Sequence, residues 1–253
     1  MKAKIQHEIQ EYCSLLRLNA ISEHFEEAIA GATDYEGFLH QLLRMEVDAE
    51  EERAKERKIK AAKFPYRKYI EDLEMDFLPE GMRNRLPELC SLDFIREGKN
   101  IIMTGNPGTG KTHTAIGLGI KACEQGYRVL YTTIPYLTEL KESNSKQKLR
   151  SYQKRFEKYD LIIADELGYI SFDREAADLL FTVLSLRASQ KSTIITSNLT
   201  FERWDEIFGD AAITSAIVDR LTYKAYLIDM EGDSYRLRET LRSNGTDFET
   251  VVK

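Results

Sequence analysis

The sequence predicts an α/β fold, a parallel sheet flanked by helices, preceded by a small all-α amino-terminal domain. Beyond residue 95, short runs of β-branched and other apolar residues alternate with amphipathic helical segments. Before residue 60, apolar residues recur at helical spacing. Because consecutive parallel strands need crossover connections, helices between the strands favour a parallel sheet. We therefore expect a helical domain over residues 1–65 and a sheet-containing domain over residues 66–253.

Five apolar runs are expected to form the strands of this sheet. They are residues 100–104, 128–133, 160–164, 192–197 and 225–229. Amphipathic segments at residues 111–124 and 174–188 are expected to form helices that cover its faces. An open sheet of this kind binds its ligand at the carboxyl ends of its strands, so the functional residues are expected there.

The amino-terminal region is expected to form helices separated by a break at residues 31–34. Residues 46–63 are rich in Glu, Lys, Arg and Ala, with almost no large apolar side chain. This composition predicts a long exposed helix that changes from acidic to basic along its length and ends at Pro65.

The formal net charge of -6 is distributed unevenly along the chain. Residues 1–52 contain 4 basic and 12 acidic residues, whereas residues 53–68 carry a net +7 and residues 141–158 a net +5. Clustered Lys and Arg bind a phosphate backbone with salt-dependent affinity and little sequence preference; the alternative is a solvated helix face. The DNA contacts expected from these two stretches are Lys55, Arg57, Lys58, Lys60, Lys141, Lys146, Lys148, Arg150 and Lys154.

Several classes of protein are disfavoured by composition. No apolar run approaches the roughly 18 residues that a membrane-spanning helix needs, and the first residues lack a signal-peptide core. The three cysteines show no paired spacing, which argues against a disulfide framework or a zinc site. We expect a cytoplasmic protein without a membrane partner.

The most specific motif is a phosphate-binding loop. Residues 105–112 match GxxxxGK[ST], directly after a predicted strand and at the start of a predicted helix. The glycines let backbone N–H groups surround a phosphate, Lys111 can reach the β and γ phosphates of ATP, and the Thr112 hydroxyl can bind Mg²⁺. The expected nucleotide-binding residues are Gly105, Asn106, Pro107, Gly108, Thr109, Gly110, Lys111, Thr112 and His113.

Acidic residues follow the third predicted strand in the arrangement called Walker B. Asp165 is expected to hold Mg²⁺ together with Thr112, and Glu166 to polarise the attacking water. Asn198 follows the fourth strand, where it is either a turn residue or a group that orients this water. Spacing alone assigns no role to Arg220 or Arg236.

The segments GNPGTGKTHTA, LIIADELGY, TSN, IVDRL and GDSYRLR, in this order, resemble the AAA+ ATPases of the helicase-loader and initiator clade. The chain is most similar to the IstB-like ATPases that assist insertion-sequence transposases. This resemblance implies an AAA+ P-loop fold without a full carboxyl-terminal lid. It also implies that Asn198 is the sensor I residue, Arg220 an arginine finger offered to a neighbouring subunit, and Arg236 the sensor II arginine.

The resemblance further implies an extra helical element at residues 135–158 that contacts DNA. The expected function is a Mg²⁺-dependent ATPase that forms a homo-oligomer on duplex DNA, with ATP sites between subunits. It would remodel the DNA and recruit a partner transposase. Two alternatives remain. The first is a replicative helicase loader that acts on single-stranded DNA and on a hexameric helicase. The second is a P-loop ATPase with a protein substrate and no nucleic acid.

Overall fold

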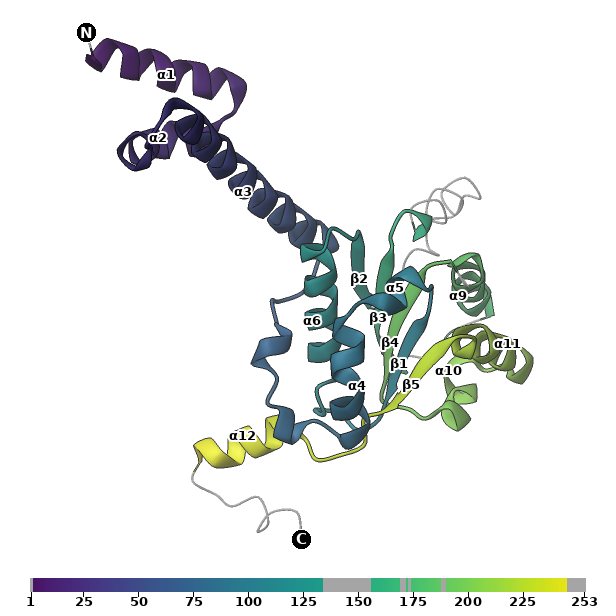
Figure 1. Cartoon of the computed structure of the whole chain (residues 1–253). Helices are drawn as coiled ribbons and strands as arrows, with labels where there is room; N and C mark the ends of the chain where they lie inside the picture. The colour runs from purple at the N-terminus through teal and green to yellow at the C-terminus, as the bar shows by residue number, and fades with distance from the viewer. Residues whose placement is uncertain (1, 134–155, 169–171, 173, 188–189, 245–253) are drawn as a thin grey trace. The chain divides into compact units, whose positions relative to one another are not determined.

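The computed structural model describes residues 2–133, 156–168, 172, 174–187 and 190–244 (Figure 1). The chain divides into two compact units, an amino-terminal unit of Met1–Arg57 and a carboxyl-terminal unit of Lys58–Lys253. The functional boundary expected after residue 65 stays a prediction. No helix in the described residues has both the length and the apolar character needed to cross a membrane.

The amino-terminal unit is entirely helical. It contains α1 (Lys2–Leu16), α2 (Asn19–Gly31) and the first part of α3 (Tyr35–Ala62). The predicted break between helices is confirmed, because α2 ends at Gly31 and α3 begins at Tyr35. The Asp34 carboxylate accepts a hydrogen bond from the Gly37 N–H at 2.7 Å, which caps the start of α3.

The carboxyl-terminal unit is built on one sheet of five parallel strands in the order β2-β3-β4-β1-β5. The strands are β1 (Asn100–Thr104), β2 (Val129–Thr133), β3 (Leu161–Leu167), β4 (Ser192–Ser197) and β5 (Ala225–Asp229). The α/β fold predicted from the sequence is confirmed. Because β1 lies between β4 and β5, the loop that follows β1 leaves the sheet near the loop that follows β4.

Helices cover both faces of this sheet (Figure 1). One apolar core lies between the sheet and a layer that includes α4 and α6, and a second core lies between the sheet and α9 to α11. The α-helices in the described residues of this unit are α4 (Glu80–Cys90), α5 (Asp93–Arg96), α6 (Lys111–Glu124), α9 (Arg174–Arg187), α10 (Asp205–Phe208), α11 (Ala211–Thr222) and α12 (Tyr235–Ser243). Short 3-10 helices occur at Ile70–Asp72, Met75–Phe77 and Phe201–Arg203.

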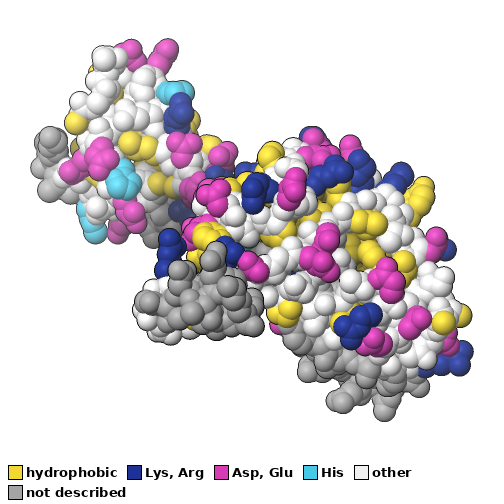
Figure 2. Space-filling model, turned by 90° about the horizontal axis from the view of Figure 1, so that it is seen from below, with side chains coloured by type: hydrophobic (Ala, Val, Ile, Leu, Met, Phe, Trp, Pro, Cys, Tyr) yellow, Lys and Arg dark blue, Asp and Glu magenta, His cyan; other side chains and the backbone are white. Residues whose placement is uncertain are grey.

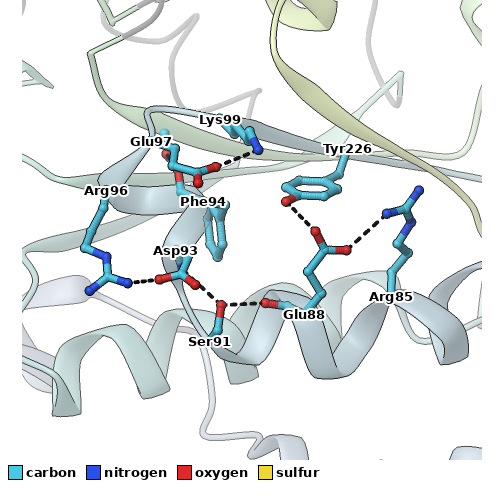
Figure 3. Close-up of polar contacts among 10 residues, drawn as sticks. Arg85, Glu88, Ser91, Asp93, Phe94, Arg96, Glu97, Lys99 and Tyr226 are labelled. Atoms are coloured by element: carbon cyan, nitrogen blue, oxygen red, sulfur yellow. Dashed lines mark hydrogen bonds and ion pairs between the residues drawn. The ribbon is translucent and has the colours of Figure 1, made fainter.

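A polar network attaches the edge strand β5 to α4 (Figure 3). The Tyr226 hydroxyl on β5 donates a hydrogen bond to Glu88 on α4 at 2.8 Å, and Arg85 donates to the same carboxylate at 3.0 Å. The cations of Arg85 and Lys99 lie 5.8 and 5.4 Å from the centroid of the Tyr226 ring. These contacts help to fix β5, the strand that leads into α12.

Candidate nucleotide-binding site

The loop between β1 and α6 depends on its glycines. Gly105, Gly108 and Gly110 have φ angles of 142°, 86° and 94°, a region that L side chains rarely adopt. A Cβ atom at Gly105 would collide with the backbone of Met230, and one at Gly108 would collide with the side chain of Ser234. The glycines therefore allow both a tight turn and a close approach of the carboxyl-terminal segment.

Lys111 is the first residue of α6 and is buried, with 9% of its surface exposed. Its ammonium donates hydrogen bonds to the carbonyl oxygens of Gly105 at 2.7 Å and Asn106 at 2.6 Å. Burial lowers the pKa of Lys111 to about 8, the Asp165 charge opposes this shift, and Arg236 adds to it. An anion beside Lys111 would favour its charged form, so the site suits a phosphate group.

Asp165 is fully buried, and hydroxyl groups from three separate elements surround its carboxylate. The Thr112 hydroxyl donates to Oδ1 at 3.1 Å, and the Tyr131 hydroxyl donates to Oδ2 at 2.6 Å. The Thr196 hydroxyl also donates to Oδ1. Burial and the neighbouring carboxylate raise the pKa of Tyr131, so its hydroxyl stays a proton donor.

Sequence reasoning missed Tyr131 and Thr196. Tyr131 lies on β2 opposite Ile163, and Thr133, two residues further along β2, lies opposite Asp165. The side chains of Tyr131 and Asp165 therefore project from the same face of the sheet. A long side chain reaches such a diagonal neighbour. The alternation along β2 was therefore a usable signal, but only once β2 and β3 were known to be adjacent.

Glu166 adopts a left-handed backbone conformation with φ of 67°. This conformation is costly for a residue with a Cβ atom, and it coincides with a register shift between Ala164 and Leu167 in the β3–β4 pairing. The Glu166 N–H donates to the Thr196 hydroxyl at 3.1 Å. Burial and the Asp165 charge raise the pKa of the Glu166 carboxyl, while Arg236 opposes this shift.

Asn198 lies directly after β4 and lines the same pocket as Glu166. Its Oδ1 atom is buried and has no hydrogen-bond partner among the described residues. A buried acceptor without a partner is costly, so this atom is suited to accept a hydrogen bond from a bound water or ligand.

Arg236 reaches the pocket from the second residue of α12. The preceding residue, Tyr235, donates its N–H to the Gly108 carbonyl at 3.0 Å and its hydroxyl to Glu74 at 2.7 Å. The Asn106 amide also donates to the Gly232 carbonyl at 3.4 Å. The short carboxyl-terminal segment is thus attached to the phosphate loop, and Arg236 projects its charge toward Lys111 and Glu166.

The pocket has a volume of about 340 Å³. Its lining includes Pro107 to His113, Glu166, Asn198 and Arg236. Leu73, Phe77, Leu78 and Tyr235 also line it. A pocket with both polar and apolar lining suits a molecule that combines a phosphate chain with a flat apolar ring.

Two of the expected nucleotide-binding residues, Gly105 and Asn106, do not line the pocket. The backbone of Gly105 and the side chain of Asn106 shape the loop instead of lining the pocket. His113 lines the pocket, and its ring lies 2.8 Å from the Tyr69 carbonyl oxygen. Tyr69 packs against the apolar core.

Thr112 and Asp165 form a suitable pair of ligands for Mg²⁺. No group of three or more His, Cys, Asp or Glu side chains in the described part of the chain could hold a metal without help. Because Mg²⁺ is commonly bound by one or two protein oxygens together with substrate phosphates, this donor set fits an ion that arrives with a nucleotide.

Arg220 does not line the pocket. It lies near the end of α11 on the surface, without a hydrogen bond or ion pair to any described residue. The Asp210 carboxylate caps the start of this helix by accepting from the N–H groups of Ala212 and Ile213. A capped helix therefore presents an exposed arginine that has no partner among the described residues.

The expected DNA-binding residues fall into two groups. Lys141, Lys146, Lys148, Arg150 and Lys154 lie outside the described residues. Lys55, Arg57, Lys58 and Lys60 lie on α3, where Lys60 and Arg57 are exposed. Arg57 forms a 2.6 Å ion pair with Glu50, and Lys58 donates to the Gly126 carbonyl. An exposed ion pair of this kind is weak, so the contact with Glu50 leaves Arg57 available for an external phosphate.

The fold and this pocket define a P-loop ATP-binding protein of the AAA+ type. Residues 13–243 match the family described as IstB-like ATP binding protein. The chain therefore belongs to the IstB-like ATP-binding family, and the resemblance found in its motifs is confirmed.

Relatives with known names support this assignment. The chain is 35% identical over 240 residues to the insertion sequence IS5376 putative ATP-binding protein of Geobacillus stearothermophilus, covering 93% of this chain and 96% of that one. It is also 35% identical over 238 residues to the insertion sequence IS21 putative ATP-binding protein of Pseudomonas aeruginosa, covering 92% and 90%.

Solved structures share the fold. The crystal structure of DnaI superposes with a TM-score of 0.57 at 20% identity, covering 70% of this chain and 98% of that one. The replication initiator DnaA bound to AMPPCP and single-stranded DNA superposes with a TM-score of 0.52 at 21% identity, covering 71% of this chain and 56% of that one.

Proposed function

We propose that the protein is a Mg²⁺-dependent ATPase that assembles on duplex DNA, remodels it and recruits a partner transposase. The observation that carries this proposal is the meeting of Lys111, Glu166 and Arg236 around one pocket, with Asp165 hydrogen-bonded to Thr112 in its wall, in a member of the IstB-like family. The insertion-sequence relatives supply the context of transposition. No membrane partner is proposed, and the protein is expected to act in the cytoplasm.

The residues predicted to be catalytic each have a role in this ATPase. Lys111 holds the phosphate chain, and the Glu166 carboxylate accepts a proton from the attacking water. Asn198 orients this water through its unpartnered amide oxygen. Arg236 stabilises charge that develops on the transferred phosphoryl group. Mg²⁺ held by Thr112 and Asp165 would neutralise negative charge on the phosphate oxygens.

Assembly of several subunits would supply a second cation that the pocket of one chain lacks. A second cation near the transferred phosphoryl group would come from Arg220 of a neighbouring subunit, because this side chain is exposed and does not line the pocket of its own chain. Hydrolysis would then require a head-to-tail oligomer. The basic stretches would bind the DNA backbone, and several subunits on one duplex would bind it more tightly than one.

DNA preference tests the proposal against its main alternative. Gel-shift titrations should show binding to duplex DNA that requires ATP and Mg²⁺ and varies little with sequence. A helicase loader would instead prefer single-stranded DNA. Preference for single strands, or weak binding to both forms without regard to ATP, would contradict the transposition proposal.

Replacing Lys146, Lys148 and Arg150 together by Ala should weaken binding to all duplex sequences alike. Each lost phosphate contact reduces counterion release, so the slope of log K against log salt should fall by about 2 to 3. Fluorescence anisotropy over a salt series measures this slope.

The matched control removes the same charge from the acidic unit, at Lys4, Arg17 and Arg44. Its slope should equal that of the unmodified chain. Equal slopes for both triple variants would place residues 146–150 on a solvated surface without DNA contact.

Tyr131→Phe should raise the Mg²⁺ concentration needed for tight ATP binding by about tenfold, because a group that orients a metal ligand commonly contributes that much to metal affinity. The variant keeps the ring and removes only the hydroxyl that donates to Asp165 at 2.6 Å. The measurement is binding of a fluorescent ATP analogue at increasing Mg²⁺.

Tyr127→Phe is the control, because Tyr127 packs against the same core and its hydroxyl forms no hydrogen bond to a described residue. This change should leave the Mg²⁺ dependence as it was. An unchanged Mg²⁺ dependence in Tyr131→Phe would show that Tyr131 supports the fold alone.

A further inference from the structure

The outer face of α3 in the amino-terminal unit carries an apolar row. Tyr35, Leu39, Leu43 and Val47 recur every four residues, and their exposed fractions are 93%, 56%, 53% and 55%. Residues spaced by four form one ridge along a helix surface, the kind of ridge that packs into the groove of another helix. These four residues form the outer row of α3.

The outer row is separate from the face that α3 uses inside its own unit. Leu42 packs against the buried cluster of Cys13, Ile21 and Phe25, and the Glu46 carboxylate accepts a hydrogen bond from the Ile21 N–H at 3.0 Å. The helix therefore has two apolar rows, and the unit itself partly covers only the row that contains Leu42. The outer row lacks an apolar partner in the described part of this unit.

The amino-terminal unit exposes an unusual share of apolar surface. Nine of the fifteen large hydrophobic side chains that the described chain exposes lie within residues 1–57. Figure 2 shows hydrophobic side chains among the carboxylates of this unit. A contiguous exposed apolar row marks an interaction site in a soluble protein, and a unit with so small a core gains stability from a bound partner.

The charge around the outer row selects the kind of partner. Residues 1–52 contain 12 acidic and 4 basic residues, and Arg44, the cation closest along the helix to Leu43, is paired with Asp48 at 3.7 Å. This negative field repels DNA, anionic membranes and a second copy of the same unit. A partner surface that is both apolar and cationic is attracted by the apolar row and by the negative charge around it.

We infer that the outer row is a docking surface for a basic amphipathic helix of another protein. The partner helix would place apolar residues three and four positions apart against Leu39 and Leu43, with Lys and Arg beside them facing the acids of the unit. This surface shares no residue with the nucleotide pocket. Binding there would tether a partner without occupying the ATP site.

The test uses the full chain and a fluorescent designed peptide of about five helical turns, with leucines at helical spacing and lysines elsewhere. Replacing Leu39 and Leu43 together by Gln should weaken binding at least tenfold while leaving the charge unchanged. Tyr35→Gln should weaken it several-fold, and its 93% exposure makes folding independent of the change. Circular dichroism checks that helix content is kept.

Leu227→Gln is the matched control, because Leu227 is an equally exposed leucine in the other unit at 56%. It should leave peptide affinity unchanged, and a peptide with Glu in place of Lys should fail to bind. Equal affinity of the double variant and the unmodified chain would overturn the inference. Concentration-dependent dimerisation that the double variant abolishes would also overturn it, because a second copy would then cover the row.

Discussion

Glu166→Gln should bind ATP with unchanged affinity and lose about 10² to 10⁴ in hydrolysis rate, the range typical for removal of a general base. The change keeps the side-chain shape, the left-handed backbone and the hydrogen bond from the Glu166 N–H to Thr196. It removes the carboxylate that accepts the proton of the attacking water. The variant should therefore accumulate in the ATP-bound, assembled state.

Phosphate release measures the rate, and light scattering with ATP measures assembly. Glu239→Gln is the matched control, since Glu239 lines the same pocket and undergoes the same chemical change with an expected small effect. Lys111→Ala should fail at the earlier step of nucleotide binding. Normal turnover by Glu166→Gln would remove Glu166 from the catalytic role.

Arg220→Ala should also bind ATP and lose about 10³ to 10⁵ in hydrolysis rate, the effect of an arginine finger supplied by a neighbouring subunit. Arg220 is exposed and unpaired among the described residues, so folding should be unaffected. Arg203→Ala, which breaks an exposed ion pair with Glu206, is the control and should keep full activity.

Mixing the Arg220→Ala and Glu166→Gln chains tests the arrangement between subunits. A site formed by the pocket of the first chain and the arginine of the second contains both intact groups. Random pairing in a head-to-tail oligomer gives such sites at about a quarter of the interfaces, so about that share of activity should return. Absence of any recovery would contradict an arginine supplied in trans.

The phosphate loop and the Walker B pair could be predicted because their signals are local. Gly105 to Thr112 form a continuous motif between a strand and a helix, and Asp165 follows a strongly apolar run. Each requires only the identity of neighbouring residues. The same locality explains why all five predicted strands were confirmed.

The residues that surround Asp165 could not be found in this way. Tyr131 and Thr196 reach it because β2 and β4 both flank β3, and this strand order is a property of the folded sheet. The position of Arg236 depends similarly on the hydrogen bond between Tyr235 and Gly108, which joins distant parts of the chain. The spacing of residues in the sequence does not show which distant strands and loops contact one another in the fold.

The outer row of α3 could not be recognised from the sequence, for a different reason. Phe38 and Leu39, like Leu42 and Leu43, are adjacent in the sequence, so two apolar rows overlap in one helical pattern. Helical spacing in the sequence does not separate the two rows. The folded unit separates them, because Phe38, Leu42 and Met45 are half-buried whereas the outer row is exposed.

The order of strands also determines when the nucleotide pocket can form during synthesis. β1 pairs with β4 and β5, so Ile101 must wait for Ile194 and Tyr226 to leave the ribosome. Pairings that are so distant in sequence form slowly, because loop-closure entropy must be overcome first. The phosphate loop is translated long before α12, which completes the shape of the pocket. A growing chain should acquire its affinity for ATP only after α12 has left the ribosome.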